Sequence, residues 1–411
     1  MLIGIDASRA NRNNRSGIEN YSLQMTLALI RQKSGHRFVL YIREPPVAEL
    51  QNLPGRVEVK IISNPSWWSS CRRILRFLPQ LWTHIALRAE LKKAPVDLLF
   101  IPGHVVPLGY SGRCIVTIHD LGYEFVPEHY SLFERLYLRF STSYSARRAG
   151  TVITVSDKTR QDLMRFVHLP AERIHVLHPG YAADLFKPRT TRTVHAIQKK
   201  YDLSSPYIIF VGNVTTKKGL ETLIEGFSLF LFEKQQNQFE TRLEKAAGSS
   251  KAVETEQEGS DAFETSALDL VIIGSGKEDY KNSLLALADK YRVADRVHFL
   301  GFVEDADLCH LLSGAKAYVQ PSHYEGFGIP VVEAMASGVP VIVTDAGGLL
   351  EVVEDAGQVC KAGDAPDLSR GLHTLLDDET IRQSWIKKGL ARVHLFNWDE
   401  AAGSLLQLIG D

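Results

Sequence analysis

The sequence predicts an α/β protein made of two doubly wound units, each a parallel sheet with helices on both faces. Short apolar runs of strand length alternate with longer helical patterns along the chain, and parallel strands require such crossover connections. The alternation restarts near the middle of the sequence. With 411 residues, the chain is long enough for two domains that each bury a core.

Seven short apolar runs in the first half are predicted strands, because most of them are bounded by Gly, Pro, Asn or Asp. They lie at residues 2–5, 37–42, 57–62, 98–101, 114–118, 151–155 and 174–177. Helical patterns separate them, among others at residues 18–33 and 133–148. We therefore expect a first domain over residues 1–190.

Five further apolar runs predict the strands of a second domain over residues 200–385. They lie at residues 207–212, 268–273, 297–300, 317–320 and 339–343. A helix is expected from Gly219, and the domain boundary between Pro188 and Pro206. Ligands of open parallel sheets bind outside the carboxyl ends of the strands. Two such sheets facing each other would hold a ligand in the cleft between them.

The last part of the chain, residues 386–411, is expected to be helical. Its apolar residues recur at helical spacing, namely Trp398, Ala401, Leu405, Leu406 and Leu408. An amphipathic helix needs a surface on which to bury its apolar face. We expect this helix to pack back on the N-terminal domain.

Residues 233–267 break the alternation. They are polar, rich in Glu and Ser, and nearly free of aromatic side chains. Such a segment lacks the apolar surface that offsets the entropy of ordering a chain. It is predicted to be a flexible surface insertion, with docking of a partner as the alternative.

Composition excludes several classes of function. The 47 basic and 48 acidic side chains give a net charge of -1, which does not favour a nucleic-acid partner. The four cysteines lie far apart without zinc-ligand spacing, so we expect buried thiols in a reducing compartment. Neither a signal peptide nor an apolar run of membrane-spanning length is recognisable. The prediction is a cytoplasmic protein, with peripheral attachment to the inner face of the cytoplasmic membrane as an option.

That option rests on residues 67–93, where bulky apolar residues such as Trp67, Trp82 and Leu87 are interleaved with basic ones. The basic residues are Arg72, Arg73, Arg76, Arg88, Lys92 and Lys93. Basic charge beside aromatic side chains suits a helix lying on anionic lipid. The alternative is an ordinary core-packing helix with exposed arginines.

The most informative stretch runs over residues 320–335. A strand is expected to end at Gln320, a Gly-rich turn to follow, and a helix to begin near Pro330. Gly326 and Gly328 allow backbone amides to approach a ligand, and the helix N-terminus behind them favours an anion such as a diphosphate. Two carboxylates flank the turn.

These carboxylates, Glu325 and Glu333, would repel a phosphate if both touched it. They are better explained as groups that bind hydroxyls, Glu333 on a ribose and Glu325 near a sugar. The alternative is a Gly-rich strand–turn–helix connection with solvated acids.

The stretch resembles the E-x7-E signature of retaining glycosyltransferases of the GT-B fold, in family 4, also called glycosyl transferases group 1. Further elements of that family follow in its order along nearly the whole chain. They are residues 16–21, 117–121, 156–157, 178–181, 211–212, 217–219 and 274–276. The resemblance implies two Rossmann-like domains, an acceptor-binding one at the N-terminus and a donor-binding one after it.

The resemblance also implies roles for individual residues. Lys218, supported by Lys217, would bind the donor diphosphate, and His119 would hydrogen-bond the transferred sugar. Gly17 would leave room for the diphosphate or acceptor. The implied catalytic residues are His119, Lys218 and Glu325. The implied donor-binding residues are Gly17, Lys217, Lys218, Gly274, Glu325, Gly326, Phe327, Gly328, Ile329 and Glu333. The chain departs from the family at Asn213, where an arginine is frequent.

The implied reaction is transfer of a hexose from a nucleoside-diphosphate sugar to a saccharide or lipid-linked acceptor in cell-envelope polysaccharide synthesis. The likeness favours mannose and GDP-mannose, with a UDP-sugar as the other option, and implies no cofactor. Two alternatives remain, namely a GT-B-fold nucleotide-sugar epimerase and a non-catalytic scaffold that recruits partners. Asp305 and Asp307 form a D-x-D pattern that other glycosyltransferases use for a metal. Because the pair opens a predicted helix, N-capping and pairing with the helix dipole explain it better, and no metal is expected.

Overall fold

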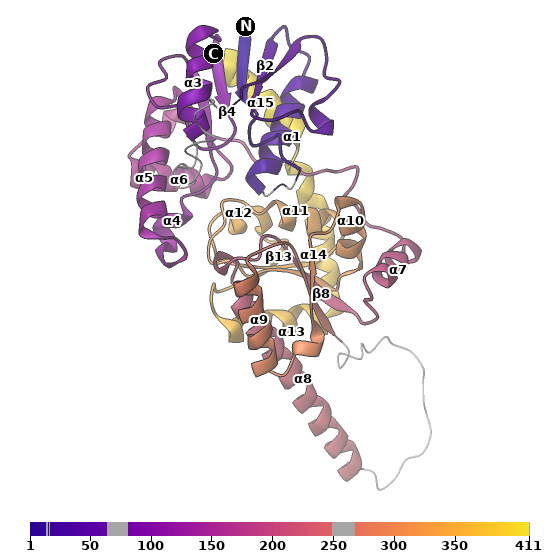
Figure 1. Ribbon diagram of the computed structural model, residues 1–411. Coiled ribbons are helices and arrows are strands. Elements are labelled where there is room, and N and C mark those ends of the chain that lie inside the picture. Colours follow the sequence, from indigo (N-terminus) through magenta and orange to yellow (C-terminus); the bar gives the residue numbers. More distant parts are fainter. Residues whose placement is uncertain (14, 16, 64–80, 249–267, 411) are drawn as a thin grey trace. The chain divides into compact units, whose positions relative to one another are not determined.

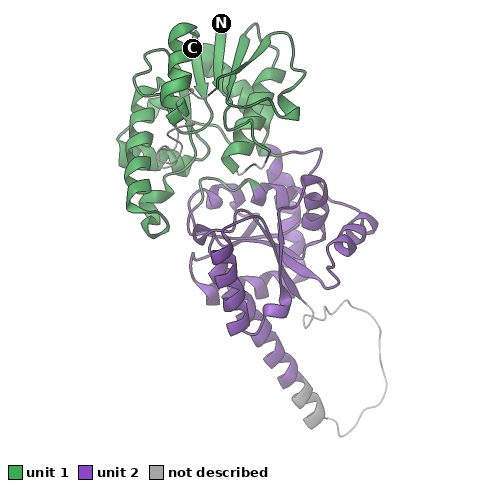
Figure 2. Ribbon diagram, in the orientation of Figure 1, with its two compact units in different colours: residues 1–181, 325–329, 395–411 green, residues 182–324, 330–394 purple. Residues whose placement is uncertain are grey.

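A computed structural model describes residues 1–13, 15, 17–63, 81–248 and 268–410, without the side chains of residues 242–248. The chain forms two compact units, shown in Figure 2. Unit 1 contains residues 1–181, 325–329 and 395–411, and unit 2 contains residues 182–324 and 330–394. The units thus divide after Tyr181, whereas the sequence analysis places the boundary between Pro188 and Pro206.

Unit 1 is built on a seven-stranded parallel sheet with the order β3-β2-β1-β4-β5-β6-β7 (Figure 1). Its strands are β1 (Leu2–Asp6), β2 (Arg37–Ile42), β3 (Val57–Ile61), β4 (Leu98–Ile101), β5 (Cys114–Ile118), β6 (Thr151–Thr154) and β7 (Ile174–Val176). All seven match predicted strands. Central strands such as β4 and β5 are buried along their whole length, as parallel strands covered on both faces must be.

The helices of unit 1 connect these strands. They are α1 (Gly17–Arg31), η1 (Ala48–Leu50), η2 (Thr83–Leu87), α3 (Arg88–Lys93), α4 (Gly122–Phe125), η3 (Pro127–His129), α5 (Leu132–Arg148), α6 (Asp157–Val167), η4 (Ala171–Arg173), η8 (Val393–Leu395, shared with unit 2) and α15 (Trp398–Gly410). The C-terminal helix α15 packs on α1, as predicted. Trp398 at its start contacts the ring of Tyr21 edge-on.

Unit 2 contains a six-stranded parallel sheet with the order β10-β9-β8-β11-β12-β13. Its strands are β8 (Tyr207–Val211), β9 (Asp269–Ile273), β10 (Val297–Gly301), β11 (Ala317–Gln320), β12 (Val341–Thr344) and β13 (Gly357–Cys360). The edge strand β13 was not predicted. Its short sequence Gly-Gln-Val-Cys is only partly buried, so it lacks the apolar run by which a central strand is recognised.

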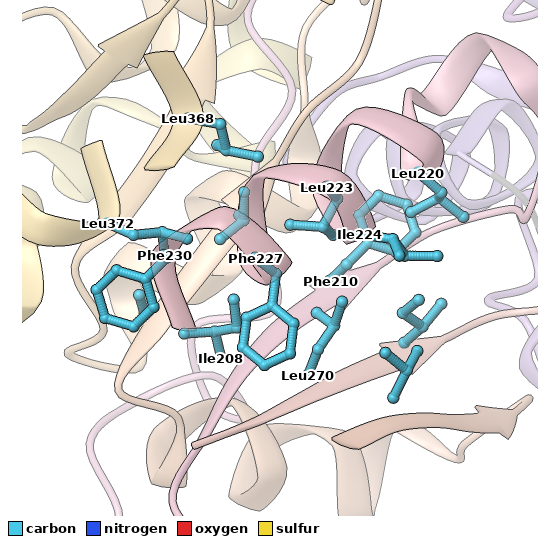
Figure 3. Close-up of a cluster of buried hydrophobic side chains, with 14 of the residues drawn as sticks. Ile208, Phe210, Leu220, Leu223, Ile224, Phe227, Phe230, Leu270, Leu368 and Leu372 are labelled. Carbon is cyan, nitrogen blue, oxygen red and sulfur yellow. The ribbon is translucent and has the colours of Figure 1, made fainter. Parts of the chain in front are cut away.

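The helices of unit 2 include one of exceptional length. They are α7 (Thr191–Lys200), η5 (Thr216–Lys218), α8 (Leu220–Gly248), α9 (Glu278–Lys290), η7 (Ala294–Arg296), α10 (Asp305–Gly314), α11 (Ile329–Ala336), α12 (Leu349–Val353), α13 (Ala365–Asp377) and α14 (Glu379–Arg392). The first turns of α8 bury Leu223, Phe227 and Phe230 against the sheet and α13 (Figure 3).

The prediction of a flexible insertion over residues 233–267 is wrong for residues 233–248, which continue α8. These residues are mainly Gln, Glu, Lys, Leu and Ala, which have high helix propensity. The polar composition that argued against a packed core therefore does not argue against an exposed helix. The rest of the predicted insertion, residues 249–267, lies outside the described residues.

In both sheets the strand order reverses beside the first strand. The reversal lies between β1 and β4 in unit 1, and between β8 and β11 in unit 2. Doubly wound sheets bind ligands at the carboxyl ends of the strands at such a point. The segments that follow these strands are therefore where each unit is expected to bind a ligand.

Candidate active site

In unit 2, the turns that follow β8 and β11 are joined to each other. The backbone N–H of His323 donates to the carbonyl oxygen of Lys217 over 2.9 Å. Gly219, with φ of +64°, lies so close to Pro321 that an added Cβ would overlap its carbonyl oxygen. Lys217 and Lys218 are half-buried on this turn. Lys217 and Lys218 therefore lie where the strand order reverses, on a turn whose backbone is held by these contacts.

Buried polar side chains hold the end of β11 in place. The side-chain amide of Gln320 donates to the hydroxyl of Ser322 over 2.8 Å. Thr344, at the end of β12, donates from its hydroxyl to the carbonyl oxygen of Ser322 over 2.6 Å. Hydrogen bonds of this kind between buried groups fix a unique local conformation. The chain therefore leaves β11 towards Glu325 along a defined path.

Glu333 lies in α11, and only 9% of it is exposed. Burial raises the pKa of Glu333 to about 8, and the nearby carboxylate of Asp305 acts in the same direction. In the empty protein at neutral pH this carboxyl group is therefore mostly protonated. Such a buried carboxyl group can lose its proton when ligand hydroxyls donate hydrogen bonds to the carboxylate. It therefore suits a ligand with several hydroxyl groups.

In unit 1, His119 follows β5 and is buried. Its Nε2 lies 2.8 Å from the carbonyl oxygen of Pro102. Because a carbonyl oxygen only accepts, Nε2 must carry the hydrogen and Nδ1 is left as an acceptor. Burial lowers the pKa of His119 to about 4, so the ring is neutral at physiological pH. A neutral acceptor suits a sugar hydroxyl better than a phosphate.

Residues 325–329 belong to unit 1 and lie against His119. A Cβ added at Gly326 would overlap the carbonyl oxygen of His119, so only glycine allows this approach. Phe327 stacks on His178 with ring centroids 5.8 Å apart, and meets Phe396 edge-on at 5.4 Å. The predicted donor loop and the predicted sugar-binding histidine are therefore in contact.

Comparison with known proteins identifies the family. Residues 192–392 match the family described as Glycosyl transferases group 1, and residues 15–185 match Glycosyltransferase Family 4. Together the two matches cover most of the chain. The chain belongs to glycosyltransferase family 4.

Two curated relatives of this glycosyltransferase are named as mannosyltransferases. O-antigen chain mannosyltransferase B of Escherichia coli is 28% identical over 70% of this chain and 67% of its own length. O-antigen chain mannosyltransferase RfbU of Salmonella typhimurium is 28% identical over 67% of this chain and 64% of its own length. The matched region thus spans about two thirds of these relatives.

Solved structures confirm the predicted GT-B fold. Sucrose-phosphate synthase from Thermosynechococcus elongatus superposes with a TM-score of 0.73 at 20% identity, covering 100% of this chain and 98% of that chain. Anabaena Alr3699/HepE in complex with UDP-glucose superposes with a TM-score of 0.71 at 18% identity, covering 100% of this chain and 99% of that chain. At these identities the likeness concerns the fold alone.

Two glycines of the family's motifs differ in their surroundings. Gly17 opens α1, and among the described residues nothing lies within 4 Å of a Cβ added there, so crowding does not require glycine at this position. Gly274 has φ of +140°, and a Cβ added there would overlap the carbonyl oxygen of Gly212. Close packing of two backbone segments is therefore sufficient reason for glycine at position 274.

Gly274→Ala is accordingly expected to destabilise the glycosyltransferase by more than ~2 kcal/mol, because the added methyl group forces two backbone segments apart at a φ that alanine avoids. Thermal or urea unfolding measures the change. Gly403→Ala in α15 is the matched control, because a Cβ there meets nothing within 4 Å and alanine favours the helix. Equal stability of the two variants would contradict the packing argument.

The prediction that the D-x-D pattern caps a helix is wrong, although both aspartates lie in the first turn of α10, where the helix dipole favours acidic side chains. Helix α10 begins at Asp305, but its N-cap is Glu304, which makes no capping hydrogen bond through its side chain. Asp307 instead accepts a 2.8 Å hydrogen bond from Tyr201 and pairs with Lys200. Within the described part of the chain, three or more potential metal ligands do not gather anywhere.

The sequence analysis gave no role in the site to three residues that lie beside candidate site residues. His323 lies between the two turns of unit 2, Asp305 acts on Glu333, and His104 accepts a 3.2 Å hydrogen bond from the backbone of His119 and stacks on its ring. His104 also has a left-handed φ of +52°. Position after a central strand was the only available signal for His104 and His323.

The segment over residues 67–93 is described only from residue 81. Trp82, Leu87 and Leu91 are buried in the core of unit 1, and the indole of Trp82 donates to the carbonyl oxygen of Ile62 over 2.8 Å. For these side chains the core-packing alternative is correct. Residues 67–80 lie outside the described residues. Over the described ranges, the helices are all too short or too polar to span a membrane.

Proposed function

We propose that this protein transfers a hexose from a nucleoside-diphosphate sugar to a saccharide, with retention of configuration at the transferred carbon. The observation that carries the proposal is the contact of Gly326 with the backbone of His119. It joins the loop of the E-x7-E signature to a neutral histidine that accepts hydroxyl hydrogen bonds. Family membership supports the same reaction class.

In this proposal the diphosphate is bound by Lys217, Lys218 and backbone amides of residues 326–329. Gly326, Phe327 and Gly328 precede α11 and Ile329 is its first residue, so their amides lie at the positive end of the helix. Lys218 is the principal cation, and Lys217 supplies the charge that Asn213 lacks. Gly17 leaves room for the diphosphate or acceptor, and Gly274 lets the turn after β9 pack against the backbone of Gly212 beside the donor.

The sugar and the ribose are bound by the neutral and acidic side chains. His119 accepts a hydrogen bond from a sugar hydroxyl at Nδ1, Glu325 lies beside the sugar, and Glu333 binds the ribose hydroxyls. The diphosphate leaves without a strong general acid, and its leaving oxygen accepts the proton that the acceptor hydroxyl loses as the new glycosidic bond forms. Lys218 stabilises the leaving diphosphate. The acceptor attacks on the face that the diphosphate vacates, held there by orientation.

The sugar we propose is mannose, with GDP-mannose as donor and a UDP-sugar as the other option. Two relatives named as O-antigen chain mannosyltransferases support mannose, and a fold neighbour solved with UDP-glucose supports a nucleotide sugar in general. The acceptor we propose is a saccharide or lipid-linked saccharide of a cell-envelope polysaccharide. The site as proposed requires no metal.

The test is release of nucleoside diphosphate from a panel of GDP-mannose, UDP-glucose, UDP-galactose and UDP-N-acetylglucosamine, with and without an α-mannosyl-terminated oligosaccharide. We expect GDP release from GDP-mannose to rise at least about tenfold when the oligosaccharide is present. Preference for a UDP-sugar would reject mannose. Conversion of a nucleotide sugar without any acceptor would favour the epimerase.

A further inference from the structure

Helix α5 exposes an apolar stripe to solvent. The stripe consists of four large apolar residues whose exposed fractions are 73% for Leu132, 59% for Phe133, 55% for Leu136 and 58% for Phe140. Their spacing of one, four and eight positions from Leu132 places them along one side of the helix. Figure 1 shows α5 along the outer edge of unit 1. We call this set the α5 stripe.

The side of α5 that faces the core fully buries only small side chains. These are Ser141, Thr142, Ser145 and Ala146, while Leu138 and Tyr144 are partly buried against the core. A helix that only packs on a core places its large apolar side chains inward. Here hydroxyls and a methyl group are buried, while two leucines and two phenylalanines remain outside. Folding of this chain therefore gives no reason for the α5 stripe, and a contiguous exposed apolar patch marks an interaction site.

The surroundings of the stripe are basic. Helix α5 contains four arginines (Arg135, Arg139, Arg147 and Arg148) and one acid, Glu134, for a net charge of +3. Glu134 is engaged in a capping box with Ser131 at the start of the helix. A hollow of about 670 Å³ at the other end is lined by Arg139, Phe140, Ser143, Tyr144, Arg147 and Arg148. Apolar and cationic groups thus share one surface.

Carbonyl oxygens hold two of these arginines in place. Arg148 donates to the carbonyl oxygens of Tyr110 and Gly112 over 2.5 and 2.8 Å, and Arg147 donates to that of Val167 over 3.2 Å. These acceptors have no formal charge, so the hydrogen bonds orient the guanidinium groups without neutralising them. Arg139 differs, because it pairs with Glu124. Apart from the pair of Arg139 with Glu124, these contacts therefore bring no negative charge to balance the arginines near the α5 stripe.

We propose that the α5 stripe docks on a membrane surface of anionic phospholipid. The leucine and phenylalanine side chains enter the boundary between headgroups and acyl chains, and the arginines bind headgroup phosphates. A second copy of the chain fits less well, because a symmetric contact through the stripe would place one helix of charge +3 against another. An anionic surface with an apolar interior satisfies both features of α5. The docking surface lies outside the proposed site for sugar transfer and does not depend on which sugar is transferred.

The test is flotation of the full chain with vesicles of phosphatidylglycerol and phosphatidylethanolamine, compared with phosphatidylcholine alone. Phe133→Ser combined with Phe140→Ser is expected to lower partitioning onto the anionic vesicles at least about tenfold. The matched control is Phe232→Ser combined with Phe239→Ser on α8, because those phenylalanines are 57% and 63% exposed in unit 2. The control is expected to bind like the wild type.

A charge variant separates lipid binding from general stickiness. Arg135→Gln combined with Arg147→Gln is expected to lower binding about tenfold or more, and wild-type binding is expected to weaken with added salt. Absence of wild-type binding to anionic vesicles at low salt would overturn the proposal. So would equal binding by the Phe133/Phe140 variant, which would place the contact on another surface such as residues 67–93. A dimer in size-exclusion chromatography that this variant abolishes would assign the stripe to a second copy instead.

Discussion

Glu325→Ala is expected to lower kcat by roughly 10²–10³-fold, while the affinity for the nucleoside diphosphate changes little. Positive charge develops on the transferred sugar as its bond to the diphosphate breaks. In the proposed site a carboxylate at position 325, next to the glycine that lies on His119, stabilises that charge in the transition state more than in the ground state. Steady-state kinetics with GDP-mannose and the oligosaccharide acceptor measures the loss.

Two further variants sharpen this result. Glu325→Gln retains hydrogen bonding but not charge, so we expect its kcat to fall between those of the wild type and Glu325→Ala. Glu379→Ala is the control, because Glu379 is an exposed acid in the first turn of α14, a helix that contributes no residue to the proposed site. A kcat for Glu325→Ala within a factor of about two of the wild type would favour the scaffold alternative.

The fold was predictable because its signals are local. Central strands such as β4 and β5 are short apolar runs with clear boundaries, and each had to lie in a parallel sheet. The failures share one cause. Strand β13 has too few apolar residues to be recognised, and residues 233–248 form a helix without apolar residues at regular helical spacing. Apolar periodicity reports neither element, because pairing with β12 determines β13 and helix propensity determines residues 233–248.

The candidate site can be proposed from the sequence as a set of residues but not as a set of charge states. The E-x7-E run and the positions after strands indicated Glu325, Glu333 and His119. Sequence alone could not show that His119 donates to the carbonyl oxygen of Pro102, because that contact joins the ends of two strands. Nor could it show that Asp305, interpreted as a capping residue, raises the pKa of Glu333. Burial and through-space charge exist only once the chain is folded.

Glu333 gives the second large effect, on the pH dependence of nucleotide binding. The pKa of Glu333 in the empty protein is about 8, and ribose hydroxyls that donate to its carboxylate would favour the ionised form. Binding of GDP should therefore release a proton below pH 8, and affinity should rise about fivefold from pH 7 to pH 8 and about twofold more before it levels off at higher pH. Calorimetry in two buffers of different ionisation enthalpy counts the protons. Working above pH 7 avoids titration of the GDP phosphate itself, whose pKa is near ~6.

Glu333→Gln is expected to lower GDP affinity roughly 10–100-fold at pH 8 and to abolish the proton release, because the neutral amide replaces charge-assisted hydrogen bonds. Proton release that persists in this variant, or GDP affinity equal to that of the wild type, would remove Glu333 from the ribose site.

The same substitution has the opposite effect on the stability of the empty protein. A carboxyl whose pKa is raised from 4.5 to about 8 on folding contributes stability that is complete below pH 4.5 and is lost as pH rises through 8. The loss is on the order of a few kcal/mol. Because glutamine does not ionise, Glu333→Gln should be more stable than the wild type at pH 8 and should lack this dependence, whereas Glu325→Gln should retain it. Glu333→Gln should therefore raise the stability of the protein and lower its affinity for GDP. Such a trade-off is expected where a buried acid is needed for binding but destabilises the fold.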